Sequence, residues 1–233
     1  MSLELLINLA YIVASVLFII GLKMLSSPAS ARRGNLLSAL GMFIAIIVTL
    51  ADREVIGYQW ILVGGVIGSA IGVAAARLIA MTAMPEMVAL LNGAGGLASM
   101  LVAWSEYQRQ AEISTFTAAI IALTVLIGAV TFTGSVLAWG KLSERFYSKP
   151  VLFQGQQVVN GLILLGILVC SVIFTLNPGQ SYWALMVLMA LSLILGVMSV
   201  IPIGGADMPV VISLLNSYSG LAACTSGLVI INN

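Results

Sequence analysis

The sequence contains no histidine, few charged residues and only two cysteines. Without histidine, the chain lacks the side chain that most often carries a proton near neutral pH or binds a transition metal. Cys170 and Cys224 both lie inside apolar runs, so we interpret them as packing residues rather than a disulfide or a metal pair. A net charge of +1 provides no basic surface for nucleic acid. We therefore expect no metal site and no nucleic-acid partner.

What the chain has in abundance is apolar sequence. Hydrophobic residues make up 61% of it and charged residues 7%, whereas a soluble domain has about a quarter of its residues charged. A membrane-spanning helix needs about 20 apolar residues. On that basis the sequence predicts an all-α, polytopic helix bundle with eight spans, one transmembrane domain over residues 1–233. The predicted spans are about 3–22, 35–51, 58–80, 85–104, 115–139, 157–176, 181–201 and 208–230.

The first span is expected to stay in the protein, because it lacks the positive start and short apolar run of a signal peptide. Positive charges then predict the orientation, since they gather on the cytoplasmic side. Seven of the nine lie on one side of the predicted bundle: Lys23, Arg32, Arg33, Arg77, Lys141, Arg145 and Lys149. Arg53 and Arg109 lie on the other. This bias places the N-terminus outside, and Asn233 as well, so either the protein ends there or a ninth span returns to the cytoplasm.

Three predicted spans carry a stripe of small and polar residues at helical spacing. The stripe of span eight is Ser213, Asn216, Gly220, Cys224 and Gly227; that of span four is Asn92, Gly96, Ser99 and Ala103; that of span five is Thr124, Gly128, Thr131 and Ser135. Such faces either pack closely against other helices or line a wet crevice. If the three stripes converge, they form a polar path through the bundle. In span three, Gly64, Gly68 and Gly72 predict a close-approach seam for a neighbouring helix.

Ionisable residues are expected at the cytoplasmic edge of the bundle. Glu86 lies at the start of span four, near Arg77 at the end of span three, and the two could form an ion pair. The segment before span eight, residues 201–209, contains two prolines and two glycines. It is predicted to be a non-helical hinge that holds Asp207 at this edge.

Three segments of the chain resemble a known family. They are PEMVALLNGAGGLASMLVAW (85–104), FTGSVLAWGKLSERFYSKP (132–150) and GGADMPVVISLLNSYSG (204–220). They are similar, in the same order, to the membrane domain of the beta subunit of proton-translocating NAD(P) transhydrogenase. The resemblance implies an inner-membrane enzyme that couples proton movement to hydride transfer between NAD(H) and NADP(H). Those nucleotides would bind in cytoplasmic domains outside this sequence, which resembles the first eight of nine spans.

The resemblance also implies roles for residues and partners. Asn216, Asn92 and Ser135 match the proton path, with Ser217 beside it, while Glu86 and Asp207 match acidic residues of the family motifs. Asn92 stands where many members have a histidine. Since a carboxamide cannot titrate near pH 7, we expect a membrane helix of an alpha subunit to provide the histidine. A second beta copy and an NADP(H)-binding domain are the other partners implied.

Two other functions fit the polar stripes. A secondary transporter for a small solute would use them as a substrate site. We find no internal repeat between the two halves and no broken helix at mid-membrane, both of which such transporters commonly have. A structural membrane anchor would use the stripes only for packing.

Overall fold

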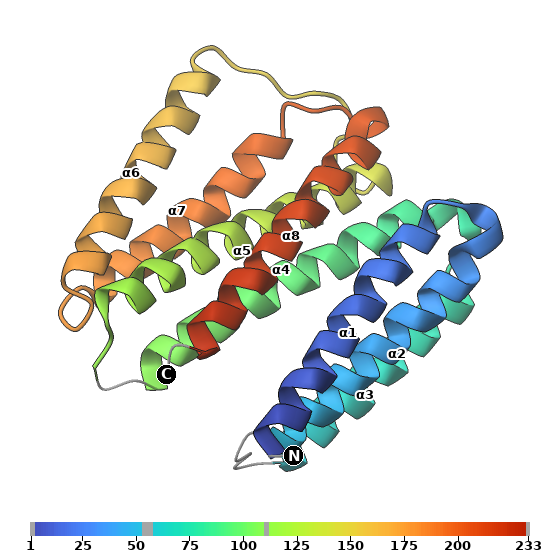
Figure 1. Ribbon diagram of the computed structural model, residues 1–233. Helices are drawn as coiled ribbons and strands as arrows, with labels where there is room; N and C mark the ends of the chain where they lie inside the picture. Colours follow the sequence, from blue (N-terminus) through green and yellow to red (C-terminus); the bar gives the residue numbers. More distant parts are fainter. Residues whose placement is uncertain (1–2, 53–57, 110–111, 232–233) are drawn as a thin grey trace. The chain divides into compact units, whose positions relative to one another are not determined.

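A computed structural model describes residues 3–52, 58–109 and 112–231, and these ranges are helical and joined by turns (Figure 1). Eight of the helices are long and apolar enough to cross a membrane, which confirms the predicted fold class. The helices are α1 (Leu3–Leu25), α2 (Pro28–Asp52), α3 (Tyr58–Leu78), α4 (Met84–Arg109), α5 (Thr115–Leu142), α6 (Gln156–Leu176), α7 (Tyr182–Val200) and α8 (Met208–Ile231). Short 3₁₀ turns, η1 (Met81–Ala83) and η2 (Gly205–Asp207), precede α4 and α8.

Several helices are longer than the apolar runs that predicted them. Helix α2 begins at Pro28 rather than near residue 35, and α4 continues to Arg109 rather than ending near residue 104. The hydrophobic thickness of a bilayer limits the apolar run, whereas backbone hydrogen bonds decide where the helix ends. Proline is favourable at the first helical position, because its missing N–H is not needed there.

The chain divides into two compact units, residues 1–73 and 74–233. In the first unit, α1 and α2 form a tight antiparallel hairpin. A Cβ atom built on Gly34 would lie 2.7 Å from the carbonyl oxygen of Gly21, and one built on Gly41 would lie 3.0 Å from that of Ala14. Only glycine allows the two backbones to come so close. The expected single domain stays a prediction.

Helix α3 has no buried residues among those that the structure describes. A Cβ built on Gly64, Gly68 or Gly72 would meet no described atom within 4 Å. Within the described part of the first unit, the predicted close-approach seam on this helix therefore has no partner.

Helix α5 is the centre of the second unit and packs against α4, α6, α7 and α8 (Figure 1). Its side chains are apolar or small on every face, and a helix of that kind is buried on all sides. Ile121 and Val125 are fully buried, as are Leu185 and Leu188 of α7, which belong to the same core. Each helix that packs on α5 is thereby placed relative to the other helices of this unit.

Aromatic contacts join α4 to α7 at the end of the unit where α4 ends. The ring of Tyr107 stacks on that of Tyr182, with centroids 5.6 Å apart, and its hydroxyl donates a hydrogen bond of 2.9 Å to the carbonyl of Pro178. Such rings are common at membrane interfaces, where one end is apolar and the other is wet.

Helices α4 and α5 approach each other closely at Gly96 and Gly128. A Cβ on Gly96 would lie 2.8 Å from the Gly128 oxygen, and a Cβ on Gly128 would lie 2.7 Å from the Gly96 oxygen. The nearest atoms are backbone atoms, so a change of side-chain rotamer on either helix cannot create space for an added methyl group. This contact sets the separation of the two helices.

We therefore predict that Gly96→Ala lowers the stability of the protein. Forcing a methyl group into a packed contact costs about 1–3 kcal/mol. The measurement is thermal unfolding in detergent. Gly161→Ala on α6 is the matched control, because a Cβ at Gly161 meets nothing within 4 Å. Equal melting temperatures for the two variants would contradict the tight α4–α5 contact.

Candidate functional site

The polar stripes of α4 and α5 face each other. Every member of the α4 stripe is buried, as is every member of the α5 stripe. The members are Asn92, Gly96, Ser99 and Ala103 on α4, and Thr124, Gly128, Thr131 and Ser135 on α5. Two of the three stripes predicted to converge therefore do meet, on both sides of the Gly96–Gly128 contact. We refer to this contact surface as the α4–α5 seam.

A hydrogen bond between Asn92 and Ser135 crosses the seam. The Asn92 Nδ2 donates to Ser135 Oγ over 2.8 Å. Asn92 is 5% exposed and Ser135 is fully buried. An amide in apolar surroundings costs several kcal/mol unless it is hydrogen-bonded, so the serine satisfies one side of Asn92. The structure thus brings together two residues that lie 43 positions apart in the sequence.

Two oxygen atoms of the seam have no hydrogen-bond partner among the residues that the structure describes. They are Asn92 Oδ1 and Thr131 Oγ1, both buried. On the same helix, the hydroxyl groups of Thr124 and Thr133 donate to the carbonyls of Ile120 and Ala129 one turn back. Buried polar atoms of this kind normally bind a protein group or an ordered water. The seam can therefore accept hydrogen bonds from water or from a side chain of a partner.

The stripe of α8 points away from the seam. Asn216, Ser217 and Gly220 are exposed, and a Cβ on Gly220 would meet nothing within 4 Å. The hydroxyl of Ser217 donates to the carbonyl of Ser213 in its own helix, over 3.3 Å. Within the described residues the stripe of α8 does not join the other two, because α8 packs through its opposite face, with Leu215 and Ala222 buried.

Asn216 opens onto a groove between α8 and the start of α4. The groove has a volume of about 370 Å³. It is lined by Met84, Pro85, Val88, Pro209, Ile212, Ser213 and Asn216. Asn92 lies inside the seam, whereas Asn216 is accessible from this groove. The two asparagines thus occupy different environments.

The starts of α4 and α8 are copies of one pattern, a repeat that the sequence analysis did not find. Each helix follows a 3₁₀ turn, and the residues Met-Pro, Leu-Leu-Asn and Gly-Leu-Ala recur at the same spacing in 84–98 and 208–222. Asn92 corresponds to Asn216, and Gly95 corresponds to Ser219. These last two also touch, since a Cβ on Gly95 would lie 3.0 Å from Ser219 Oγ. The two helices run side by side in the same direction but bury opposite faces.

The charged residues predicted at the edge do not form the expected ion pair. Glu86 is half-buried, whereas Arg77 and Asp207 are exposed. Among the described residues, the ion pair found joins Arg109 to Glu106 at 3.9 Å rather than Arg77 to Glu86. Glu86 in the first turn of α4 and Asp207 directly before α8 both stand where a helix dipole favours negative charge.

Sequence analysis treated Lys141 only as a positive charge on one side of the membrane. The structure buries its side chain in the last turn of α5, with 2% exposed. The apolar neighbours of Lys141 within a helical run were the available signal. A lysine is almost never fully buried unless its ammonium group is bound.

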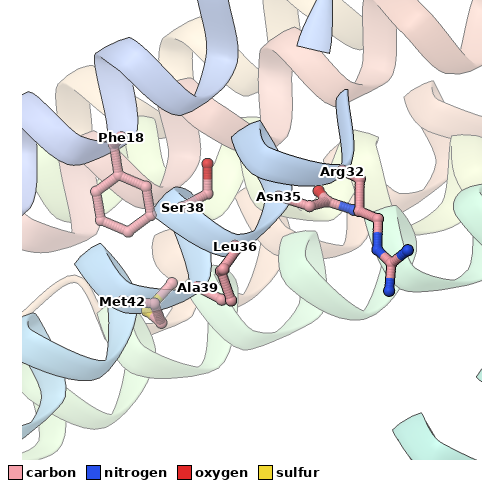
Figure 2. Close-up of a pocket in the computed structure, with 7 residues that line it drawn as sticks. All are labelled: Phe18, Arg32, Asn35, Leu36, Ser38, Ala39 and Met42. Atoms are coloured by element: carbon pink, nitrogen blue, oxygen red, sulfur yellow. The ribbon is translucent and has the colours of Figure 1, made fainter. Parts of the chain in front are cut away.

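A second groove lies between α1 and α2 and has a volume of about 760 Å³ (Figure 2). Phe18 of α1 contributes to it, and the other lining residues come from α2: Arg32, Asn35, Leu36, Ser38, Ala39 and Met42. It contains none of the predicted path residues. No cluster of three metal-binding side chains occurs in the described ranges, where Cys170 and Cys224 are both free thiols.

Comparison with known proteins identifies the family. The NAD(P) transhydrogenase beta-subunit family matches residues 7–233. The chain belongs to this family. It is 43% identical over 226 residues to the NAD(P) transhydrogenase subunit beta of Rhodospirillum rubrum, and equally so to that of the strain ATCC 11170. The match covers 94% of this chain and 48% of each relative, so the chain spans about half the length of these beta subunits.

The seam bond predicts energetic coupling between Asn92 and Ser135. Ser135→Ala leaves a buried Asn92 donor without a partner, which costs about 1–3 kcal/mol. Once Asn92→Leu is present, Ser135→Ala should cost much less. A double-mutant cycle on thermal unfolding in detergent should give a coupling energy of about 1 kcal/mol. Additive effects of the two substitutions would show that the bond contributes nothing.

Proposed function

We propose that this chain is the proton-conducting membrane part of an NAD(P) transhydrogenase, which couples proton movement to hydride transfer between NAD(H) and NADP(H). Hydride transfer would take place in cytoplasmic domains outside this sequence. The observation that supports this most is the Asn92–Ser135 hydrogen bond, which in a chain of this family is buried between two membrane-length helices. Intramembrane polar groups are expensive and commonly mark ion or proton pathways.

In this mechanism the asparagines orient water rather than carry the proton. A carboxamide has two donors and an acceptor but does not titrate near neutral pH. Asn92 holds Ser135 with its Nδ2 and keeps its Oδ1 free to accept a hydrogen bond. Asn216, with Ser217 beside it, would extend a chain of hydrogen-bonded water molecules from the groove. The proton carrier would be a histidine from a membrane helix of an alpha subunit.

The exposed stripe of α8 is the surface we propose for that helix. The same pattern on α4 is covered by α5, a helix with small residues, whereas on α8 it is open. Small residues let two membrane helices approach closely. A membrane helix of the alpha subunit that packed there would bring its histidine to the level of Asn216, over the groove that begins at Pro85 and Pro209. A second beta copy would complete a dimer of alpha–beta units.

Coupling is assigned to the end where α4 and α8 begin. The charge bias would put this end in the cytoplasm of a bacterium, with the N-terminus outside the inner membrane. Glu86, Asp207 and Arg77 would there meet the NADP(H)-binding domain. Two arrangements of the membrane helices, biased by nucleotide and by proton, are required for coupling.

One observation from the structure favours the alternative function, a small-solute transporter. Transporters commonly contain repeats, and the α4/α8 pattern is a repeat. It covers only the first half of two helices, however, and both helices run uninterrupted through the membrane-length segment. Family membership favours the transhydrogenase.

The function is tested with Asn216→Leu in the complete enzyme, reconstituted into vesicles with its alpha subunit. We expect proton pumping to fall by tenfold or more, since about 1.4 kcal/mol of lost stabilisation in the path is sufficient for that. Hydride transfer between the nucleotides should fall less. Asn160→Leu on α6 is the matched control, because it removes another intramembrane asparagine away from the seam. Unchanged pumping in Asn216→Leu would remove this residue from the path.

The docking surface is tested with Gly220→Leu. A leucine on the stripe should keep the partner helix away, so less alpha subunit should co-purify with beta in mild detergent. Gly161→Leu adds the same side chain to an equally open glycine on α6. Full retention of alpha by Gly220→Leu, or equal loss in both variants, would contradict this surface.

A further inference from the structure

The buried ammonium group of Lys141 binds two backbone carbonyls of the segment that joins α7 to α8. Its Nζ lies 2.7 Å from the oxygen of Ile201 and 2.6 Å from that of Ile203. Ile201 is the residue that caps α7, so its carbonyl belongs to the negative end of a helix dipole. Within the described residues no carboxylate lies within ion-pair distance of this lysine. Carbonyl oxygens therefore provide the compensation for its charge.

The same segment is held by a second set of bonds from the loop after α5. Ser148 Oγ donates to the Lys141 carbonyl over 2.9 Å, and the Gly205 N–H donates to the Ser148 carbonyl over 2.8 Å. The Val151 N–H donates to the Ile201 carbonyl over 3.2 Å. We call these residues the Lys141 clasp: Lys141, Ser148, Val151, Ile201, Ile203 and Gly205.

Gly205 packs closely inside the clasp. A Cβ on Gly205 would lie 3.2 Å from the Lys141 oxygen and 3.3 Å from Ser148 Cβ. Gly205 opens the 3₁₀ turn η2 that ends at Asp207, and α8 follows at once. The clasp therefore determines where α8 begins relative to the end of α5.

Helix α5 connects the clasp to the seam. Ser135 lies six residues before Lys141 on the same helix, which corresponds to about 9 Å along the axis. If the segment before α8 moved while α5 stayed in place, a buried ammonium would lose its hydrogen bonds, and this is costly in apolar surroundings. The segment before α8 and the end of α5 are thus constrained to move together.

We propose that Lys141 is a positioning residue that transmits movement between the start of α8, with Asp207, and the Asn92–Ser135 pair. The proposal rests on the proposed function for what this movement does, since the clasp itself is a feature of the fold. The Nζ atom of Lys141 contacts the carbonyl oxygens of Ile201 and Ile203. It acts through Ile201, Ile203 and α5.

The test uses Lys141→Met in the complete enzyme, which keeps most of the apolar stem and removes the ammonium. Two readouts are needed. The first is the labelling rate of a cysteine introduced as Ile203→Cys, in a background with Cys170 and Cys224 replaced by serine. The second is the ratio of protons pumped to hydride transferred. We expect labelling to become several-fold faster and the pumping ratio to fall several-fold.

Control variants keep the result interpretable. Lys149→Met removes an exposed lysine eight residues along and should change neither readout. Lys141→Arg retains the charge and the donors, and should restore part of the pumping ratio. Ser148→Ala removes one bond of the clasp and should give a smaller change of the same kind, which is the variant to use if Lys141→Met does not fold.

Each remaining outcome overturns a definite part of the proposal. Unchanged labelling in Lys141→Met and in Ser148→Ala would show that the clasp does not hold the segment. Faster labelling with an unchanged pumping ratio would remove Lys141 from coupling. Equal effects in Lys149→Met would show that the change is not specific. If the unmodified enzyme moves no protons, the proposed function fails. The labelling result still shows whether the clasp holds the segment before α8.

Discussion

The close approach of α4 and α5 at Gly96 and Gly128 is the contact on which the rest of the second unit depends. In a membrane there is little hydrophobic gain from bringing two helices together, because lipid is as apolar as the helix surface. Close backbone packing must provide the attraction instead. Once the two glycines meet, the polar residues of the two stripes are buried, and their polar atoms then depend on the few hydrogen-bond partners within reach.

That enclosure explains why Asn92 bonds to Ser135. At this separation the hydroxyl of Ser135 comes within 2.8 Å of the Asn92 amide nitrogen, and the amide oxygen of Asn92 stays available. The Lys141 clasp follows the same rule at the end of the helix, where carbonyls of a helix terminus satisfy a buried cation. In both cases a hydrogen bond compensates the burial of the polar group. Because the bonding partner lies on a different element, the bond also links the positions of the two elements.

Helices α4 and α8 show how one pattern can serve two surfaces. Both carry Met-Pro, Leu-Leu-Asn and Gly-Leu-Ala at the same spacing, yet α4 buries the asparagine stripe and α8 buries the opposite face. The difference lies in what each helix packs against, since α5 covers the stripe of α4. The chain covers the asparagine stripe of α4 with α5 and leaves the same stripe on α8 exposed. The exposed stripe is available to another helix, which agrees with the proposed alpha-subunit partner.

The fold class, the number of membrane-length helices among the described residues and the membership of the three polar stripes all follow from the sequence, since apolar length and helical spacing are local properties. The prolines and glycines of residues 201–209 predict a non-helical hinge that holds Asp207, whereas the structure has Asp207 at the end of the 3₁₀ turn η2, directly before α8. Three features follow instead from the packing of the helices: Asn92 bonds to Ser135, Asn216 is exposed, and Lys141 is buried. Those outcomes depend on which faces of the helices pack together, and the local sequence of one helix does not specify which helix will cover each of its faces.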